Sequence, residues 1–277
     1  MLFKLIALDS DGTLTNSKKN ISARTKNKLL FFQKNGGKIV LASGRPIQGV
    51  MPYASELKLS QFGGYIMPFN GGSIINCKTG EHVYNDYLPH SYIPEICSII
   101  KDYPVGIITY KDGKIICGQQ INKYAELEGR INFTPINFDA DFVNNINDDV
   151  PKCLLTGDPE VISELENVLS ERFGNELGIF KSEPFFLEIV PKTVDKAQSL
   201  NRLLQKLDIS TDECIAFGDG FNDITMIRFA GLGIAMNNAS DTVKESADYV
   251  TASNDDDGIA ILLEEMGRSV FPSLAML

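Results

Sequence analysis

The chain has 277 residues, 43% of them hydrophobic and 22% charged, which is typical of a globular protein with one large domain or two ordinary ones. Its formal net charge of −10 disfavours nucleic acid and anionic membranes as partners, and no apolar run approaches the roughly 20 residues of a membrane-spanning helix. Five scattered cysteines without a Cys-x-x-Cys pair, and only two histidines, indicate reduced thiols in a cytoplasmic protein and argue against a zinc site.

The first predicted element is a buried strand over residues 3–9, an apolar run that stops at Asp9. Asp11 follows after one residue, and residues two apart in a strand point to the same side. Two carboxylates this close repel each other unless a hard cation lies between them or one of them holds a proton. Taken alone, the "DSDG" stretch is equally typical of a surface turn.

A helix is predicted over residues 22–36, with Ser22 suited to cap its start and Gly36 its end, and a second buried strand over 37–43. Ser43 and Gly44 follow that strand and precede a proline, so backbone N–H groups and a hydroxyl there suit a phosphate. A turn of this kind more often caps a helix and binds nothing. Arg45 faces the same edge and is a candidate substrate contact.

Asn70 follows another apolar run and is a second candidate for substrate contact, although a turn role suits it equally. From about residue 84 to 188 the pattern changes: the strand candidates at 105–112, 114–119, 152–158 and 185–191 are shorter and more alternating, with helices predicted over 90–103 and 159–174. We expect an inserted α+β domain at 84–188, within a core formed by residues 1–83 and 189–277.

The alternation resumes with a helix over 195–209 and strands over 213–219, 232–236 and 247–251. It predicts an α/β core with a doubly wound, Rossmann-like parallel sheet, whose ligands bind beyond the carboxyl ends of the strands. The strand at 213–219 ends at Asp219, and Asn222 and Asp223 follow it. Because Mg²⁺ prefers oxygen ligands, we expect it at Asp9, Asp219 and the backbone carbonyl of Asp11, with Asp223 nearby.

Lys196, at the start of the predicted helix, would normally be a solvated surface lysine, and it gains interest only if it balances an anionic site. The run Asp255, Asp256 and Asp257 resembles a solvated helix start more than a metal site.

Four motifs occur in order: "DSDGTLTNS", "LASGRP", the lysine of "PKTVDKAQSL" and "GDGFNDITM". Together they resemble the haloacid dehalogenase superfamily of phosphatases, specifically its Cof-type subgroup with a large α/β cap. The resemblance implies that Asp9 is the nucleophile and Asp11 the general acid/base. It further implies phosphoryl binding by Ser43 and Lys196, Mg²⁺ binding by Asp9, Asp219 and the Asp11 carbonyl, and support of metal or substrate by Asn222 and Asp223.

The sequence departs from this pattern at two places. Thr193 and Ala197 stand where glycines are expected beside Lys196, and Ser10 is smaller than the hydrophobic residue common between the two aspartates. Neither departure removes a catalytic group, but both bear on how closely these backbones approach the substrate.

We therefore expect a Mg²⁺-dependent phosphohydrolase that cleaves small phosphate monoesters through an aspartyl-phosphate, with sugar phosphates ahead of cofactor phosphates. A phosphotransferase or mutase with the same intermediate is the alternative, followed by a phospho-accepting signalling domain. A small phosphorylated metabolite is the expected partner, and both a monomer and a homodimer remain open. The tail after Met266 has no assigned function.

Overall fold

The computed structural model describes residues 3–270, so residues 271–277, part of the tail without an assigned function, lie outside the described residues. The chain forms two compact units. The first contains the residues up to Gly44, Val50–Tyr84 and the residues from Asp195 on; the second contains Arg45–Gly49 and Asn85–Val194. No helix within residues 3–270 is long and apolar enough to cross a membrane.

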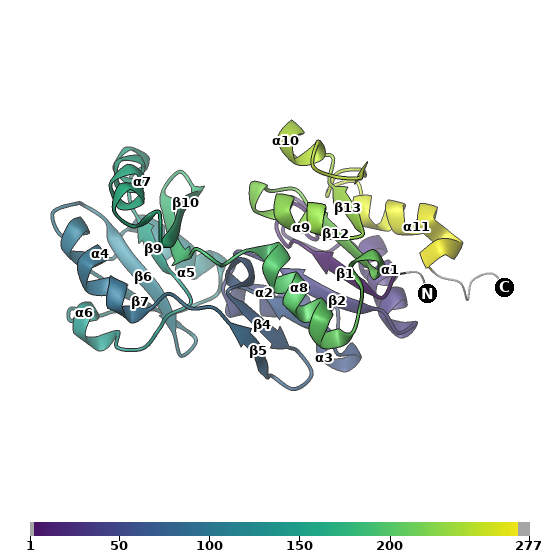
Figure 1. Ribbon diagram of the computed structural model, residues 1–277, viewed down its shortest axis with the longest axis horizontal. Coiled ribbons are helices and arrows are strands. Elements are labelled where there is room, and N and C mark those ends of the chain that lie inside the picture. Colours follow the sequence, from purple (N-terminus) through teal and green to yellow (C-terminus); the bar gives the residue numbers. More distant parts are fainter. Residues whose placement is uncertain (1–2, 271–277) are drawn as a thin grey trace. The chain divides into compact units, whose positions relative to one another are not determined.

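The first unit is built on an eight-stranded sheet with the order β14-β13-β12-β1-β2-β3-β4-β5 (Figure 1). From β14 to β3 all neighbouring strands are parallel, and β4 runs antiparallel to β3. The strands are β1 Leu5–Leu8, β2 Lys38–Ala42, β3 Tyr65–Met67, β4 Ser73–Asn76, β5 His82–Asn85, β12 Cys214–Gly218, β13 Leu232–Ala235 and β14 Tyr249–Val250. This confirms the expected α/β sheet.

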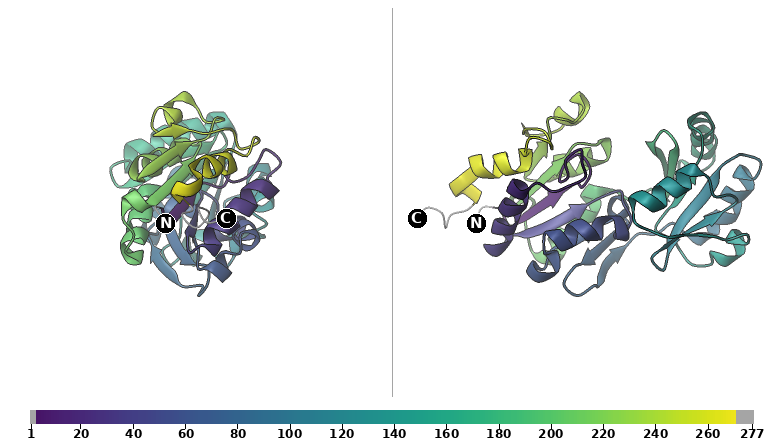
Figure 2. Two further views of the ribbon diagram at one scale, coloured as in Figure 1. Left: turned by 90° about the vertical axis from the view of Figure 1, so that its right-hand side faces the viewer. Right: turned by 180° about the vertical axis from the view of Figure 1, so that it is seen from behind.

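Helices cover both faces of this sheet, as the two views of Figure 2 also show. On one face, Leu200 and Leu203 of α8 and Met226 of α9 pack against alternate strand residues, among them Ala7 and Val40. The other face carries α1, which contacts α11 through an ion pair of 2.6 Å between Arg24 and Glu264. The helices are α1 Ala23–Lys34, α2 Ile47–Glu56, α3 Leu59–Phe62, α8 Lys196–Leu207, α9 Ile224–Phe229, α10 Asp241–Lys244 and α11 Gly258–Val270.

The end caps of α1 follow from its sequence. The Ser22 side chain accepts a hydrogen bond from the backbone N–H of Thr25, as predicted. At the other end the C-cap residue is Asn35, and Gly36 follows it with a φ of 91°, a left-handed conformation that favours glycine.

The second unit contains a six-stranded sheet with the order β10-β11-β9-β6-β7-β8, antiparallel except between β7 and β8. Its strands are β6 Gly106–Lys111, β7 Lys114–Gly118, β8 Ile136–Phe138, β9 Cys153–Thr156, β10 Leu177–Glu183 and β11 Phe186–Pro191, and its helices α4 Ile93–Ile100, α5 Lys123–Ile131, α6 Phe142–Asn145 and α7 Pro159–Phe173. Because β11 continues to Pro191, this unit runs past residue 188, the expected end of the insertion.

The two faces of the second sheet differ in character. Alternate residues such as Ile107 and Leu155 pack with α4 and α7 in a large apolar core. The residues between them, which point to the other face, include Tyr110, Lys152 and Glu188, and all three are buried. Lys152 Nζ lies 2.7 Å from Glu188 Oε2, so this face holds an ion pair that is almost inaccessible to solvent.

This buried ion pair gives a stability prediction. Lys152→Met leaves the Glu188 carboxylate buried without its partner, which we expect to lower the free energy of unfolding by about 3–5 kcal/mol. Lys152→Met combined with Glu188→Leu removes both charges and should recover a large part of that loss. Urea denaturation of both variants measures the difference. A single variant as stable as the wild type would show that the pair contributes nothing.

Candidate active site

Three neighbouring strands of the first sheet end at the same edge. In the register of the sheet, Leu8 of β1 pairs with Phe217 of β12 on one side and with Leu41 of β2 on the other. Asp9, Asp219 and Ser43 follow the ends of these three strands, so the carboxyl edge of the sheet places an acid between a second acid and a hydroxyl group.

Lys196 places a positive charge at this edge of the sheet. It is the first residue of α8, whose N-cap Asp195 accepts a hydrogen bond from the backbone N–H of Gln198. Lys196 is 1% exposed, and its Nζ donates to Asp9 Oδ1 and to Asp223 Oδ1, both at 2.6 Å. The prediction that Lys196 is a solvated surface lysine, one of the two alternatives for this residue, is therefore wrong.

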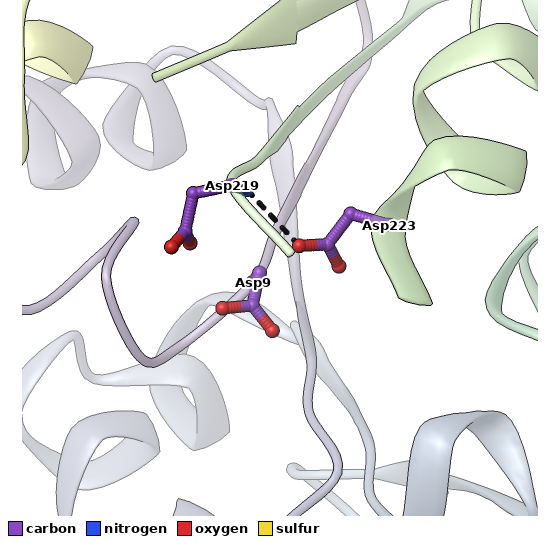
Figure 3. Close-up of side chains that lie close together, drawn as sticks. All are labelled: Asp9, Asp219 and Asp223. Atoms are coloured by element: carbon purple, nitrogen blue, oxygen red, sulfur yellow. Dashed lines mark hydrogen bonds between the residues drawn. The ribbon is translucent and has the colours of Figure 1, made fainter. Parts of the chain in front are cut away.

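Asp9, Asp219 and Asp223 form one acidic cluster, in which one carboxylate oxygen of each lies within 4.8 Å of the others (Figure 3). Asp223 is fully buried, and its Oδ2 accepts hydrogen bonds from the backbone N–H of Asp219 at 3.0 Å and of Gly220 at 2.8 Å. These bonds fix the turn after β12, so the turn itself orients Asp219 and Asp223.

The cluster carries more negative than positive charge. Burial and the charge of Asp223 raise the pKa of Asp9 from 3.8 to about 8, although Lys196 acts in the opposite direction. Burial likewise raises the pKa of Asp219 to about 6. Burial alone would lower the pKa of Lys196, but the charges of Asp223 and Asp9 outweigh it and raise this pKa.

The loop after β1 is shaped by its contacts with Asp219. Gly12 has a φ of 81°, and a Cβ atom there would lie 2.2 Å from Asp219 Oδ2, so only glycine fits. Thr13 Oγ1 donates to Asp219 Oδ1 at 2.6 Å, and Asn238 Nδ2 donates to the Gly12 carbonyl at 2.8 Å. Ser10 is fully buried, and its hydroxyl has no hydrogen-bond partner in residues 3–270.

Asp11 points elsewhere. Its Oδ1 accepts a hydrogen bond from Lys19 Nζ at 2.8 Å, and its side chain is 34% exposed. Its carboxylate therefore lies outside the acidic cluster, in a position that solvent reaches.

A second set of hydrogen-bonded polar residues surrounds the end of β2. The backbone N–H of Asn70 donates to the Ser43 carbonyl at 2.8 Å, and Asn222 Nδ2 donates to Asn70 Oδ1 at 2.8 Å. Asn70 has a left-handed φ of 56°, and a Cβ on Gly44 would lie 3.3 Å from its Oδ1. Asn70 therefore joins the loops that contain Ser43 and Asn222. This structural role is close to the turn role that was the alternative to substrate contact.

Arg45 belongs to a different neighbourhood. Although it follows Gly44 directly, it lies in the short segment that packs with the second unit, where its Nη1 donates to the Ile131 carbonyl at 2.8 Å.

The acidic run Asp255–Asp257 immediately precedes α11, as predicted for a helix start, and Asp255 accepts a hydrogen bond from the Ser17 backbone.

Two residues of the site were not predicted from the sequence. Thr13 lies inside the first motif, in which the two aspartates are the stronger signal. Asn238 follows β13, which ends at the same edge of the sheet. A polar residue just after a parallel strand is the signal that identified Asp9 and Asp219, and it was available for Asn238 as well.

Comparisons with known proteins identify a family. A family model of haloacid dehalogenase-like hydrolases matches residues 6–263. A haloacid dehalogenase-like hydrolase from Bacteroides thetaiotaomicron is 43% identical, with a TM-score of 0.91 over 95% of this chain and 99% of that one. A 5-amino-6-(5-phospho-D-ribitylamino)uracil phosphatase of Bacillus subtilis is 31% identical over 93% of each chain.

A solved structure of a subclass IIB sugar phosphatase of the same superfamily is 26% identical, with a TM-score of 0.78 over 95% of this chain and 99% of that one. The family match covers both the acidic edge of the first sheet and the whole second unit. The chain therefore belongs to the haloacid dehalogenase-like hydrolases.

Proposed function

We propose that the protein is a Mg²⁺-dependent phosphatase that hydrolyses small organic phosphate monoesters through a phosphorylated Asp9. The observation that carries the proposal is the buried Lys196, whose ammonium lies between Asp9 and Asp223. The family supports a hydrolase, and the phosphatases among the relatives support phosphate esters as its substrates.

Asp9 is the proposed nucleophile. It follows β1 directly, and its backbone N–H donates to the Phe217 carbonyl at 3.1 Å, so the carboxylate is held at a fixed point of the edge. Its attack on phosphorus displaces the alcohol and forms an acyl phosphate, which water then hydrolyses; one difficult displacement becomes two easier ones. Lys196 provides a fixed positive charge beside the phosphoryl oxygens as their charge develops.

The residues present fit a hard divalent cation. The cluster offers only oxygen donors, and burial, together with the negative charge of Asp223, raises the pKa of Asp9 and of Asp219. Asp9 and Asp219, with the Asp11 carbonyl and with Asp223 beside them, would hold Mg²⁺. When bound, such a cation would favour the ionised carboxylates and would neutralise charge on the phosphoryl group.

Asp11 is the proposed general acid/base. Its carboxylate is partly exposed and lies outside the cluster, so it can exchange protons with solvent while Asp9 stays buried. In the first step it gives a proton to the leaving alkoxide, and in the second it takes one from the attacking water. Its present partner is Lys19, whose Nζ donates to it at 2.8 Å.

The phosphoryl group itself is expected to contact Ser43, Gly44 and Asn222 in addition to Lys196. Ser43 and Gly44 leave the end of β2, and the link from Asn222 through Asn70 holds the two loops together. We propose that these loops fix the orientation of the phosphate, while the acids and Lys196 provide the chemistry.

The second unit is the proposed cap, and the first unit the proposed catalytic core. The acidic cluster and Lys196 lie entirely within the first unit. They offer few groups that could recognise the part of a substrate beyond its phosphoryl group. Recognition of the leaving group is therefore assigned to the second unit. Sugar phosphates are the favoured substrates, which the resemblance to a sugar phosphatase supports. A phosphotransferase or mutase would share the intermediate and differ only in the final acceptor.

Asp9→Asn should lower the turnover of p-nitrophenyl phosphate by at least about a hundredfold, because an amide cannot attack phosphorus. Steady-state kinetics measures the loss, and circular dichroism checks the fold. Asp102→Asn, which changes an exposed aspartate of the second unit, is the matched control and should keep full activity. An Asp9→Asn enzyme with more than about a tenth of wild-type turnover would exclude Asp9 as the nucleophile.

Removal of divalent cations by EDTA should abolish hydrolysis of p-nitrophenyl phosphate and of a panel of sugar phosphates. Added Mg²⁺ should restore it, whereas Ca²⁺ should restore it poorly because it favours longer bonds and more ligands. Activity is measured as released phosphate after dialysis. Undiminished activity in metal-free buffer would contradict the proposed metal site.

Asp11→Asn should lower kcat/KM for sugar phosphates much more than for p-nitrophenyl phosphate, whose phenolate leaves without a proton. The comparison uses kcat/KM because that constant reports the step in which the leaving group departs. Equal losses for both kinds of substrate would instead assign Asp11 a structural role.

A further inference from the structure

Asn254, in the loop between β14 and α11, binds the loop that carries Asp11. Its Nδ2 donates a hydrogen bond to the Thr15 carbonyl at 2.9 Å. Thr15 is paired with Asp11 by a backbone bridge, and its own N–H and hydroxyl group donate to the Ser10 carbonyl at 3.0 and 2.9 Å. The Asn254 amide therefore contacts the residue that lies opposite Asp11 in this loop.

The same asparagine also orients Asn238, which contacts the loop at a second point. The backbone N–H of Asn254 donates to Asn238 Oδ1 at 3.0 Å, and Asn238 Nδ2 donates to the Gly12 carbonyl at 2.8 Å. Because an amide oxygen only accepts hydrogen bonds and an amide nitrogen only donates them, these two bonds fix the orientation of the Asn238 side chain. The two asparagines thus bind the chain one and four residues after Asp11.

A third contact lies further along the same loop. The backbone N–H of Ser17 donates to Oδ1 of Asp255, the first residue of the acidic run before α11, at 2.8 Å. Within the loop, Asn16 Oδ1 accepts hydrogen bonds from two backbone N–H groups at 3.0 Å. All of these residues belong to the first unit, so the contacts do not depend on the second.

The proposed role of Asp11 requires an accurate position that its strand does not provide. Asp11 lies three residues beyond Leu8, where β1 ends, and its side chain is 34% exposed. A general acid/base must come within hydrogen-bond reach of the proton that it transfers, and a small misplacement lowers the rate strongly. The contacts of the loop therefore decide where the Asp11 carboxylate lies. The proposed mechanism so far uses neither Asn254 nor Asp255.

We infer that Asn254 is a positioning residue, which holds the loop of Asp11, through Thr15 and Asn238, in the place where the carboxylate transfers its proton to the leaving group. The inference rests on the proposed function in that it takes Asp11 as the general acid/base. It assigns to the loop after β14 a part in proton transfer, separate from binding of the metal and of the phosphoryl group.

Steady-state kinetics with two kinds of substrate tests this. Asn254→Ala should lower kcat/KM for the best substrate of a sugar phosphate panel by about tenfold, because a displaced acid protonates the leaving alkoxide poorly. For p-nitrophenyl phosphate, whose phenolate leaves without a proton, the loss should stay below about twofold. Circular dichroism checks the fold. Equal losses for both substrates, or no loss for either, would overturn the inference.

A double-mutant cycle connects the effect to Asp11. If Asn254 acts by placing Asp11, Asn254→Ala should cause no further loss with the sugar phosphate once Asp11→Asn has removed the acid. Losses that multiply in the double variant would show that Asn254 acts independently of Asp11, and they would overturn the inference.

A nearly isosteric variant tests whether the amide donor is what matters. Asn254→Asp keeps the size of the side chain but places an oxygen against the Thr15 carbonyl, so it should show the same selective loss as Asn254→Ala. Wild-type kinetics in Asn254→Asp would contradict a role for this hydrogen bond.

Two controls separate positioning from loss of stability. Thr251→Val removes a buried hydrogen bond of 2.7 Å to the Gly258 carbonyl in the same segment, so it should lower the unfolding temperature and leave the ratio of the two kcat/KM values unchanged. Asn237→Ala makes the matched change at an exposed asparagine beside Asn238 and should behave as the wild type. The same selective loss in Thr251→Val would assign the effect to stability and overturn the inference.

Hydrogen exchange of the full chain, without Mg²⁺ or substrate, gives a measurement that does not depend on turnover. In Asn254→Ala the peptide of residues 10–20 should exchange several-fold faster than in the wild type, because its loop is less firmly held. The peptide of residues 38–45 should exchange at the wild-type rate. Unchanged exchange in residues 10–20 would overturn the positioning role.

Failure of this inference differs from failure of the proposed function. Equal losses on both kinds of substrate in Asp11→Asn would remove the acid/base role of Asp11 itself. A selective loss in Asp11→Asn without one in Asn254→Ala would overturn only the role of Asn254.

Discussion

The position of a single ammonium group constrains the site. Lys196 Nζ is buried and hydrogen-bonded to both Asp9 and Asp223, which come from different parts of the chain. A buried charge is costly unless it is paired and satisfied, and the two carboxylates together satisfy the buried lysine. The third acid, Asp219, gives the site an excess of negative charge, which makes it suited to a divalent cation.

The rest of the first unit keeps these groups in place. The parallel register of β12, β1 and β2 brings three strand ends to one edge, and backbone N–H groups after β12 hold Asp223. Gly12 lets the loop after β1 approach Asp219 closely, and Asn238 fastens that loop. The groups of the site are thus placed on strand ends of the first unit.

The sequence predicted β1, β2 and β12 to within about two residues at each end, because buried parallel strands are continuous apolar runs. It did not predict α5, whose sequence contains a glycine. The sequence also could not predict that Lys196 is buried, because its partners Asp9 and Asp223 lie 187 and 27 residues away along the chain. The four acids were named from strand ends, but the contact of Asp11 with Lys19 depends on a loop conformation that local patterns do not determine. The catalytic roles of these residues stay predictions.

The central claim is that Asp9 itself carries the phosphoryl group, and acid quenching of a single turnover tests it most directly. The Asp11→Asn variant, mixed with p-nitrophenyl phosphate, forms the intermediate without needing a proton donor but lacks the base that hydrolyses it. Peptide mapping after the quench should find one phosphoryl group, labile to hydroxylamine, on the peptide that contains Asp9. A protein that carries no phosphoryl group while p-nitrophenolate is being released, or one that carries it on another residue, would contradict the account.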